Sequence, residues 1–388
     1  MRRRRRRDMG FTVSTLSTVD ELRRLEPEWR ELLGRMGADL PFLWPEWTIT
    51  WWELFRQERA FIRDSLCVKV VRRDSGELVC VVPLMLTQRP GVGPARVSTL
   101  GFLGADRYVT EQRAPIVDPS CGAEVARALA RHLASNAEWD WIAWEGLDRE
   151  SELAKTLAGV MNLRWEDSQA GNIVHLPASW EEYRRGFREH LKKSVRHGYN
   201  SLKREGLSFQ FEVAATPEQI SPALEIFFQL HRLLEMADPE TRFDRFADPI
   251  ARRFLIEVCS RLAKRNITRV LTFRIQGVPV ASRVAFQLPG CLYLYHSGAD
   301  PAWRKYAPAT TIVAEAVKYA IGAGLPRLHL SMGTDPSKSR WDPVMPIFHR
   351  AVCVRPQLSS RLALGVYSWV RDTAPLAQVR GVLGRRFS

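Results

Sequence analysis

The junction at residues 291–323 constrains the fold more than any other stretch of the chain. The strand-forming run CLYLYHS is followed by the loop GADPAWRKYAPA and by a helix-forming run from Thr310 to Ala323. A strand that passes through a short loop into a helix leaves N–H groups and the positive end of the helix dipole facing that loop. The junction therefore predicts a unit of an α/β protein with an anion site at its loop.

The loop sequence suits the close approach of a phosphate. Ala307 and Ala309 have small side chains, Pro308 fixes the turn and has no N–H, and Arg304 offers a positive charge. We interpret RKYAPA as a pyrophosphate cradle, with an ordinary surface loop as the alternative. The predicted cradle residues are Arg304, Lys305, Ala307, Ala309 and Thr310, and Tyr295 and Ser297 at the end of the preceding strand complete the predicted cofactor-binding set.

The rest of the chain reads as two mixed α/β units. Strand-turn-strand patterns occur in both halves, in VKVVRRDSGELVCVVPLM and in TRVLTFRIQGVPVASRVAF, which favours duplicated halves. Between them we expect one long charged helix from Trp180 to about Arg204, and a final strand at IFHRAVCV closes the second unit. We predict a basic disordered tail over 1–10, domains over 11–165 and 166–356, and an amphipathic basic helix over 357–388.

Composition limits the partners and the compartment. The net charge of +14 favours anionic partners such as cofactor phosphates, nucleic acid or an acidic membrane surface, although six of the 57 basic residues form the run Arg2–Arg7. Six scattered cysteines without a CxxC pair indicate reduced thiols, a cytoplasmic protein and no metal site. No apolar run predicts a membrane span, so membrane contact would be peripheral, through the helix over 357–388.

The spacing Arg304-x-x-Ala307-x-Ala309 resembles the (Gln/Arg)-x-x-Gly-x-(Gly/Ala) motif that binds acetyl-CoA pyrophosphate in GNAT acyltransferases. The order of LTFRIQGVPVASRVAF, CLYLYHSGADP, RKYAPATTIVAEAVKYAIGAG and LHLSMGTDPSKSRW resembles the CelD/BcsL-like (BioF2-like) acetyltransferases, relatives of the Fem peptidoglycan-bridge transferases. The resemblance covers most of residues 40–353. It implies an α/β tandem GNAT fold with mixed central sheets flanked by helices, and acetyl-CoA as co-substrate.

The chain departs from that family pattern at three positions. Ala307 stands where the family has Gly, His329 where it has Asp, and Ser337 where it has Tyr. Asp335 and Lys338 occupy the expected places, and with His329 they are our predicted substrate-binding residues.

The chemistry that the resemblance implies is attack of a neutral amine on a thioester beside the fourth strand. His296 is the predicted base, Asp300 would orient the amine, and Tyr306 or Tyr295 would protonate the leaving thiolate. The alternatives are a histidine bonded to a neighbouring carbonyl, a turn aspartate and packed tyrosines.

Two further groups have both structural and functional readings. One face of the predicted long helix is basic and carries Arg185, Arg188, Lys192 and Arg196. This face is either solvated, or it contacts a CoA phosphate, a polyanion or RNA. Four tryptophans lie close together in the sequence, at Trp44, Trp47, Trp51 and Trp52. They either pack in the core or stack on a sugar acceptor.

We predict transfer of an acetyl or other acyl group from acyl-CoA to an amine on a small molecule, a sugar or a cell-envelope precursor. Fem-like aminoacyl transfer from tRNA is an alternative, less favoured. A second alternative is a non-catalytic GNAT-like module that binds a partner in polysaccharide biosynthesis. The acceptor, the acyl chain and the oligomeric state do not follow from the sequence.

Overall fold

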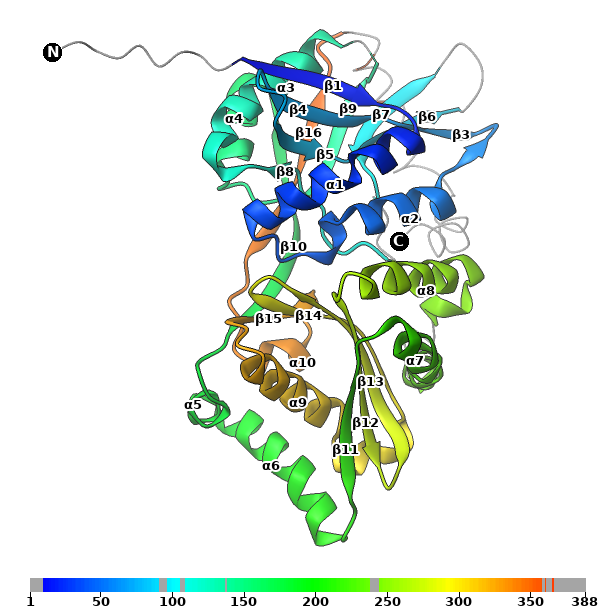
Figure 1. Cartoon of the computed structure of the whole chain (residues 1–388), viewed down its shortest axis with the longest axis vertical. Coiled ribbons are helices and arrows are strands. Elements are labelled where there is room, and N and C mark those ends of the chain that lie inside the picture. Colours follow the sequence, from blue (N-terminus) through cyan, green and yellow to red (C-terminus); the bar gives the residue numbers. More distant parts are fainter. Residues whose placement is uncertain are drawn as a thin grey trace, which may run out of the picture. The chain divides into compact units, whose positions relative to one another are not determined.

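The computed structural model describes residues 10–90, 96–104, 109–136, 138–237, 244–357, 360 and 365 (Figure 1). The chain forms two compact units. Unit 1 comprises Met1–Met36, Phe42–Ser168 and Ile347–Ser388, and unit 2 comprises Gly37–Pro41 and Gln169–Pro346.

Unit 1 contains two sheets and four helices. The strands β1 (Phe11–Leu16), β4 (Val68–Arg73), β5 (Leu78–Val82) and β8 (Ile116–Val117) form an antiparallel sheet in that order. The second sheet is mixed and has the order β16 (Ile347–Val354), β9 (Trp141–Leu147), β7 (Val97–Phe102), β6 (Leu84–Arg89), β3 (Ile62–Leu66) and β2 (Glu58–Arg59). The helices are α1 (Val19–Met36), α2 (Pro45–Phe55), α3 (Gly122–Ser135) and α4 (Glu152–Val160).

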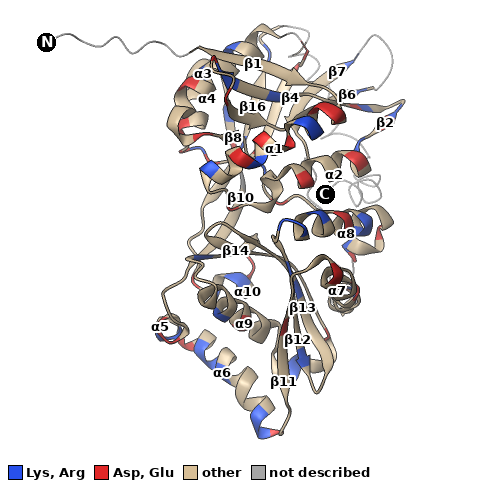
Figure 2. Ribbon diagram, viewed as in Figure 1, with Lys and Arg blue, Asp and Glu red and all other residues tan. Residues whose placement is uncertain are grey.

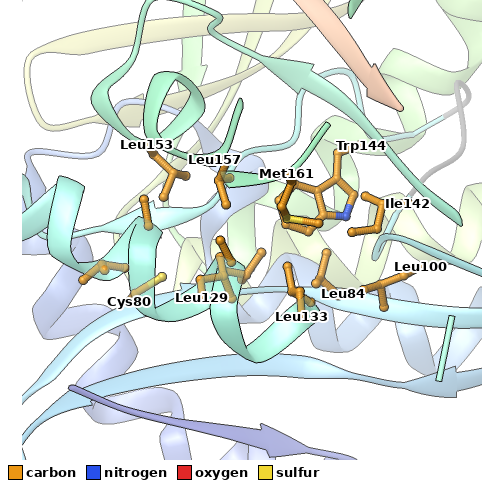
Figure 3. Close-up of a cluster of buried hydrophobic side chains, with 14 of the residues drawn as sticks. Cys80, Leu84, Leu100, Leu129, Leu133, Ile142, Trp144, Leu153, Leu157 and Met161 are labelled. Carbon is orange, nitrogen blue, oxygen red and sulfur yellow. The ribbon is translucent and has the colours of Figure 1, made fainter. Parts of the chain in front are cut away.

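The core of unit 1 follows from the apolar spacing of its elements. Leu129 and Leu133 lie one turn apart on α3 and pack with Trp144 of β9 and Leu157 of α4 (Figure 3). At the start of α1, Thr18 and Glu21 form a capping box, because the Thr18 N–H donates to the Glu21 carboxylate and the Glu21 N–H donates to Thr18 Oγ1.

In its described residues, unit 2 contains six neighbouring strands of a mixed sheet, with helices on both faces. Its strand order is β11 (Phe209–Ala214), β12 (Thr268–Ile275), β13 (Val278–Leu288), β14 (Cys291–Ala299), β15 (Arg327–Met332) and β10 (Arg164–His175), and β14–β15 is the parallel pair. Its helices are α5 (Trp180–Arg185), α6 (Glu189–Arg204), α7 (Pro217–Ala237), α8 (Pro249–Ala263), α9 (Pro308–Gly322) and α10 (Pro336–Ser339), with two 3₁₀ turns, η3 (Arg245–Ala247) and η4 (Pro301–Tyr306).

The two faces of this sheet have different partners. Leu292 and Leu294 of β14 share a core with Ile312 and Val313 of α9, and α6 contributes to the same core. The opposite face carries α7, which contacts β12, β13 and β14 (Figure 1).

Three sequence expectations differ from the structure. The strand β16 pairs antiparallel with β9 of unit 1, whereas we expected it in the second domain; an apolar strand pattern defines which face is buried but not which strand is its neighbour. The strand β10 was not predicted, because RWEDSQAGNIVH has little apolar alternation. The expected helix from Trp180 to Arg204 is two helices, since Gly186 ends α5 and Arg188 precedes α6.

All six cysteines are buried, and none of them forms a disulfide. Among the described residues no helix has both the length and the apolarity to cross a membrane. The Arg2–Arg7 run lies outside the described residues, as does the expected helix over 357–388 apart from residues 357, 360 and 365.

Gly298 sets the approach of α7 to the sheet, and its replacement gives a stability prediction. A Cβ on Gly298 would lie far inside van der Waals contact with the backbone of Leu230 and His231. We expect Gly298→Ala to lower the free energy of unfolding by about 2 kcal/mol or more. Gly322→Ala is the control, because open space surrounds that position of α9. Urea titration of both variants checks this, and an equal effect of the two would contradict it.

Candidate functional site

A bulge in β14 ends its pairing with β15. The parallel ladder consists of Cys291↔Arg327, Leu292↔Leu328 and Tyr293↔His329. On the other side of β14, the register with β13 changes so that Tyr295 and His296 together lie opposite Val284. A bulge bends its strand and increases the local twist. We call the diverging ends, residues 294–299 of β14 and 330–332 of β15, the strand fork.

The β15 side of the strand fork is held by β10. Ser331 has a positive φ of 68°, which turns the strand end out of a regular ladder. The buried Asn172 of β10 donates from Nδ2 to the carbonyls of Ser331, at 3.1 Å, and Gly333, at 2.7 Å. These bonds stabilise the bent end of β15.

The loop after β14 leads to the first turn of α9 without a side-chain cap. Asp300 caps η4, because its Oδ1 accepts from the Ala302 N–H at 2.9 Å. Ala307 then adopts the left-handed conformation, with φ 51° and ψ 45°, and no side chain caps α9. Ala309 and Arg304 are exposed. Pro308 has no N–H, and the Thr310 and Thr311 N–H groups donate to the Ala307 carbonyl at 3.0 Å, so the helix N-terminus offers the N–H of the exposed Ala309 and the positive end of its dipole.

The helix α6 supports this N-terminus from the side. Gly198 packs so closely on α9 that a Cβ would clash with Thr311 Oγ1, and His197 Nε2 lies 2.9 Å from the Lys305 carbonyl oxygen. Glu205 accepts from the Tyr306 hydroxyl and pairs with Lys305 at 3.3 Å.

Two arginines flank the N-terminus of α9. Arg340 donates from Nη1 to Thr310 Oγ1 at 3.1 Å. Arg304 has no ion-pair partner among the residues that the structure describes. Figure 2 shows further Lys and Arg positions along the ribbon of α6. This end of unit 2 is thus an exposed, positively charged surface suited to an anion.

A pocket of about 220 Å³ lies next to Arg340. Its walls include the aromatic rings of Tyr183, Phe187 and Trp341, and Arg188 and Arg340 also line it. The pocket combines flat aromatic surfaces with two guanidinium groups, a combination that suits a nucleotide base and its phosphate.

His296 lies on the face of β14 that α7 covers. Its ring contacts Phe246 of η3, with centroids 5.0 Å apart, and His231 of α7, at 6.0 Å. Its Nε2 atom is buried and has no hydrogen-bond partner among the described residues. Burial, together with the positive charges of Arg245 and Lys338, holds the pKa of His296 well below its usual value. His296 is therefore a neutral imidazole near pH 7.

His231 and Asp244 complete this cluster, and the sequence analysis missed both. His231 Nδ1 lies 3.3 Å from Asp244 Oδ1, and burial lowers the pKa of His231 to about 4. Both residues precede His296 by more than 50 positions and carry no local motif. The signal that could have found them is Gly298, whose missing side chain admits the α7 backbone at His231.

The other predicted catalytic residues have structural partners. Tyr306 is buried and its hydroxyl donates to Glu205, the residue that follows α6, while the Asp300 carboxylate caps η4. Tyr295 is buried and packs on Phe286, and Ser297 lies opposite Arg283 of β13. The structure thus brings Tyr295, His296 and Ser297 to the strand fork and turns the Tyr306 hydroxyl toward α6.

The predicted substrate-binding residues separate into two places. Asp335 pairs with Lys338 at 3.2 Å beyond the end of β15, and the charge of Lys338 contributes to the low pKa of His296. His329 lies instead at the last pair of the closed ladder, stacked on Tyr293.

Among the described residues, one group could hold a metal, and it consists of Asp39, Cys291 and His329. However, Arg327 Nη1 pairs with Asp39 Oδ2 at 2.8 Å. That ion pair competes with a metal for Asp39.

The structure separates the residues of the expected basic face and buries most of the tryptophan cluster. Arg185 belongs to α5 and not to the helix that carries Lys192 and Arg196, and Arg188 pairs with Asp342. Trp47, Trp51 and Trp52 are buried, and Trp47 Nε1 donates to Thr110 Oγ1 at 3.1 Å within unit 1.

Residues 187–339 match the family model described as "Acetyltransferase (GNAT) domain". The structure of FemX superposes with a TM-score of 0.56 at 12% sequence identity, covering 82% of this chain and 95% of FemX. A conserved protein of unknown function from Bacteroides thetaiotaomicron VPI-5482 gives a TM-score of 0.51 at 10% identity, covering 88% and 100%. No curated protein matches the sequence. The predicted α/β class, with mixed sheets flanked by helices, is confirmed, and the match to the GNAT domain lies within unit 2.

The left-handed Ala307 yields a stability prediction. A non-glycine residue in this conformation costs about 1–2 kcal/mol, whereas glycine loses about 0.5–1 kcal/mol more backbone entropy on folding. We expect Ala307→Gly to raise the free energy of unfolding by about 0.5–1 kcal/mol. Ala309→Gly, in the first turn of α9, is the matched control and should destabilise. Urea midpoints measure both, and a destabilised Ala307→Gly would contradict the expectation.

The buried histidines give unit 2 a pH dependence. Because their pKa values are lowered in the folded protein, the unfolded chain binds protons first as the pH falls below about 6.5. The free energy of unfolding then decreases by up to about 1.4 kcal/mol per pH unit for each histidine. We expect His296→Asn to reduce the loss of stability between pH 7 and pH 5, measured by urea unfolding. The exposed His190→Asn is the control, and an unchanged acid sensitivity of His296→Asn would contradict the prediction.

Proposed function

We propose that unit 2 is a GNAT-type N-acyltransferase that moves an acetyl or other acyl group from acyl-CoA to an amine. The observation that carries the proposal is the uncapped N-terminus of α9, flanked by Arg304 and Arg340, directly after the strand fork. A thioester needs a slot beside a strand and its pyrophosphate needs N–H donors and positive charge, and this arrangement supplies both within one strand–loop–helix unit.

The CoA part of acyl-CoA would bind along the positively charged surface at the N-terminus of α9. The pyrophosphate lies at the first turn of α9, where Ala309 has no side chain beyond Cβ to block it and Arg304 supplies charge. The adenosine enters the pocket of Tyr183, Phe187 and Trp341, with Arg188 and Arg340 near its phosphate. Arg340 links the two places, because it contacts Thr310 and also lines the pocket.

The reaction would take place at the strand fork next to His296. The amine nitrogen forms a bond to the thioester carbon, the carbon–sulfur bond breaks, and CoA leaves as the thiolate. His296 is neutral near pH 7 and its Nε2 has no hydrogen-bond partner among the described residues, so with its proton on Nδ1 it would accept at Nε2 the proton that the amine loses. Asp335 and Lys338, at the end of β15, lie on the side from which an amine of a small molecule, sugar or cell-envelope precursor would enter.

Calorimetry with acetyl-CoA tests the proposal. We expect micromolar binding, weakened about tenfold by Arg304→Gln through loss of a charged contact to phosphate. Arg274→Gln is the control, because Arg274 pairs with Glu212 on the strands β12 and β11, and it should bind like the wild type. Dephospho-CoA should bind more weakly than CoA, and Arg188→Gln should remove that difference.

Two outcomes would contradict the proposal at different levels. Absence of acetyl-CoA binding at high micromolar concentration, together with binding of charged tRNA, would favour Fem-like aminoacyl transfer. Binding of acetyl-CoA without thiol release on a broad amine panel would indicate a binding module and not an enzyme.

A further inference from the structure

Arg283 of β13 is a charged side chain for which the protein supplies no partner. In the described part of the chain it makes no hydrogen bond and no ion pair within 4 Å, and its Nε atom is buried. It lies opposite Ser297 of β14, immediately beside the bulge. The carboxylate whose charge acts on it is Asp335, which is already bonded to Ser337 and paired with Lys338.

Other buried arginines of the chain are saturated with acceptors. Arg269 of the neighbouring strand β12 donates to Gln287, Tyr319 and Asn266 and to two backbone carbonyls. Arg113 donates to the carbonyls of Gly104 and Thr110. A buried Nε without a hydrogen bond also occurs at Arg73, Arg245 and Arg350, but those side chains have other partners, whereas Arg283 makes no hydrogen bond or ion pair in the described part of the chain.

An unpaired guanidinium in this position works against folding. Arg283 is half-buried, and burial lowers the pKa of its guanidinium to about 10, while the charge of Asp335 acts in the opposite direction without forming an ion pair within 4 Å. The same short region holds two more buried polar atoms without partners, Ser282 Oγ and His296 Nε2. Ser282 and His296 lie on the face of the sheet that α7 covers, and Arg283, opposite Ser297, lies on the other face, so polar groups without partners border the bulge on both sides.

We propose that Arg283 binds an anionic group, a carboxylate or a phosphate, carried by the substrate at the strand fork. The proposal rests on the acyltransferase function above and extends it to a substrate class. The anion belongs to the acyl chain, as in a dicarboxylic acyl-CoA, or to the acceptor amine, as in an amino acid or a phosphorylated amine. The phosphates of CoA itself have their own cations at Arg304 and Arg340, on the exposed surface.

A stability measurement tests Arg283 independently of any activity. Methionine has a similar length and no charge, so Arg283→Met removes the uncompensated cation from the unliganded protein. We expect its urea midpoint to equal or exceed that of the wild type. Arg269→Met leaves several buried acceptors without their hydrogen-bond donor, so it should lower the urea midpoint. A midpoint of Arg283→Met that falls as far as that of Arg269→Met would overturn the proposal.

Binding and turnover measurements identify the source of the anion. One arm compares succinyl-CoA with acetyl-CoA by calorimetry; the other compares thiol release with amino acids against their amides, and with phosphoethanolamine against ethanolamine. We expect a preference of roughly tenfold or more for the anionic member in one arm. Arg283→Met should abolish the preference and Arg274→Gln should retain it.

The outcomes separate this inference from the proposed function. No preference in either arm, or an equal loss of affinity for acetyl-CoA and free CoA in Arg283→Met, would overturn the assignment of Arg283. If the wild type binds none of the acyl-CoA compounds, the proposed function fails. The urea midpoints of Arg283→Met and Arg269→Met still show in that case whether the charge of Arg283 lacks a partner in the folded protein.

Discussion

The bulge opposite Val284 is the feature on which the candidate site depends. Two residues of β14 face one residue of β13, so the strand turns away from β15 after three paired positions. Without the extra residue, β14 and β15 would continue as a closed parallel ladder, and their backbone groups would bond to each other. The loop to α9 would then leave from a closed ladder.

Packing around the bulge keeps both faces of β14 in place. On one face, α9 and α6 bury Leu292 and Leu294, and Gly198 lets α6 reach the first turn of α9. On the other face, Gly298 admits α7, which carries His231 to the side of His296. Two glycines on different elements thus define how closely each helix approaches, because at these positions any side chain would collide with a neighbour.

Features that depend on a local sequence pattern could be predicted, whereas features that depend on residues far away in the chain could not. The strand–loop–helix order around residues 291–323 and the α/β class were predictable, because apolar periodicity and turn residues act within a few positions. The partner of β16, the polar strand β10 and the contacts of His231 depend on residues far away in the chain. Ala307 illustrates both cases: its place in the motif was recognised, but its left-handed backbone follows from the packing of η4 against α6.

The different exposure of Arg304 and Arg283 has a consequence for the ionic strength of the surroundings. Counterions in solution screen exposed charges over about 8–10 Å, whereas they reach a buried charge poorly. Arg304 is exposed, whereas Arg283 is half-buried and its Nε atom is inaccessible to water. Salt would therefore weaken the attraction of the α9 surface for phosphate more than the attraction of Arg283 for its anion. In a concentrated electrolyte, recognition by this unit would shift from the nucleotide end of a ligand to its reacting end.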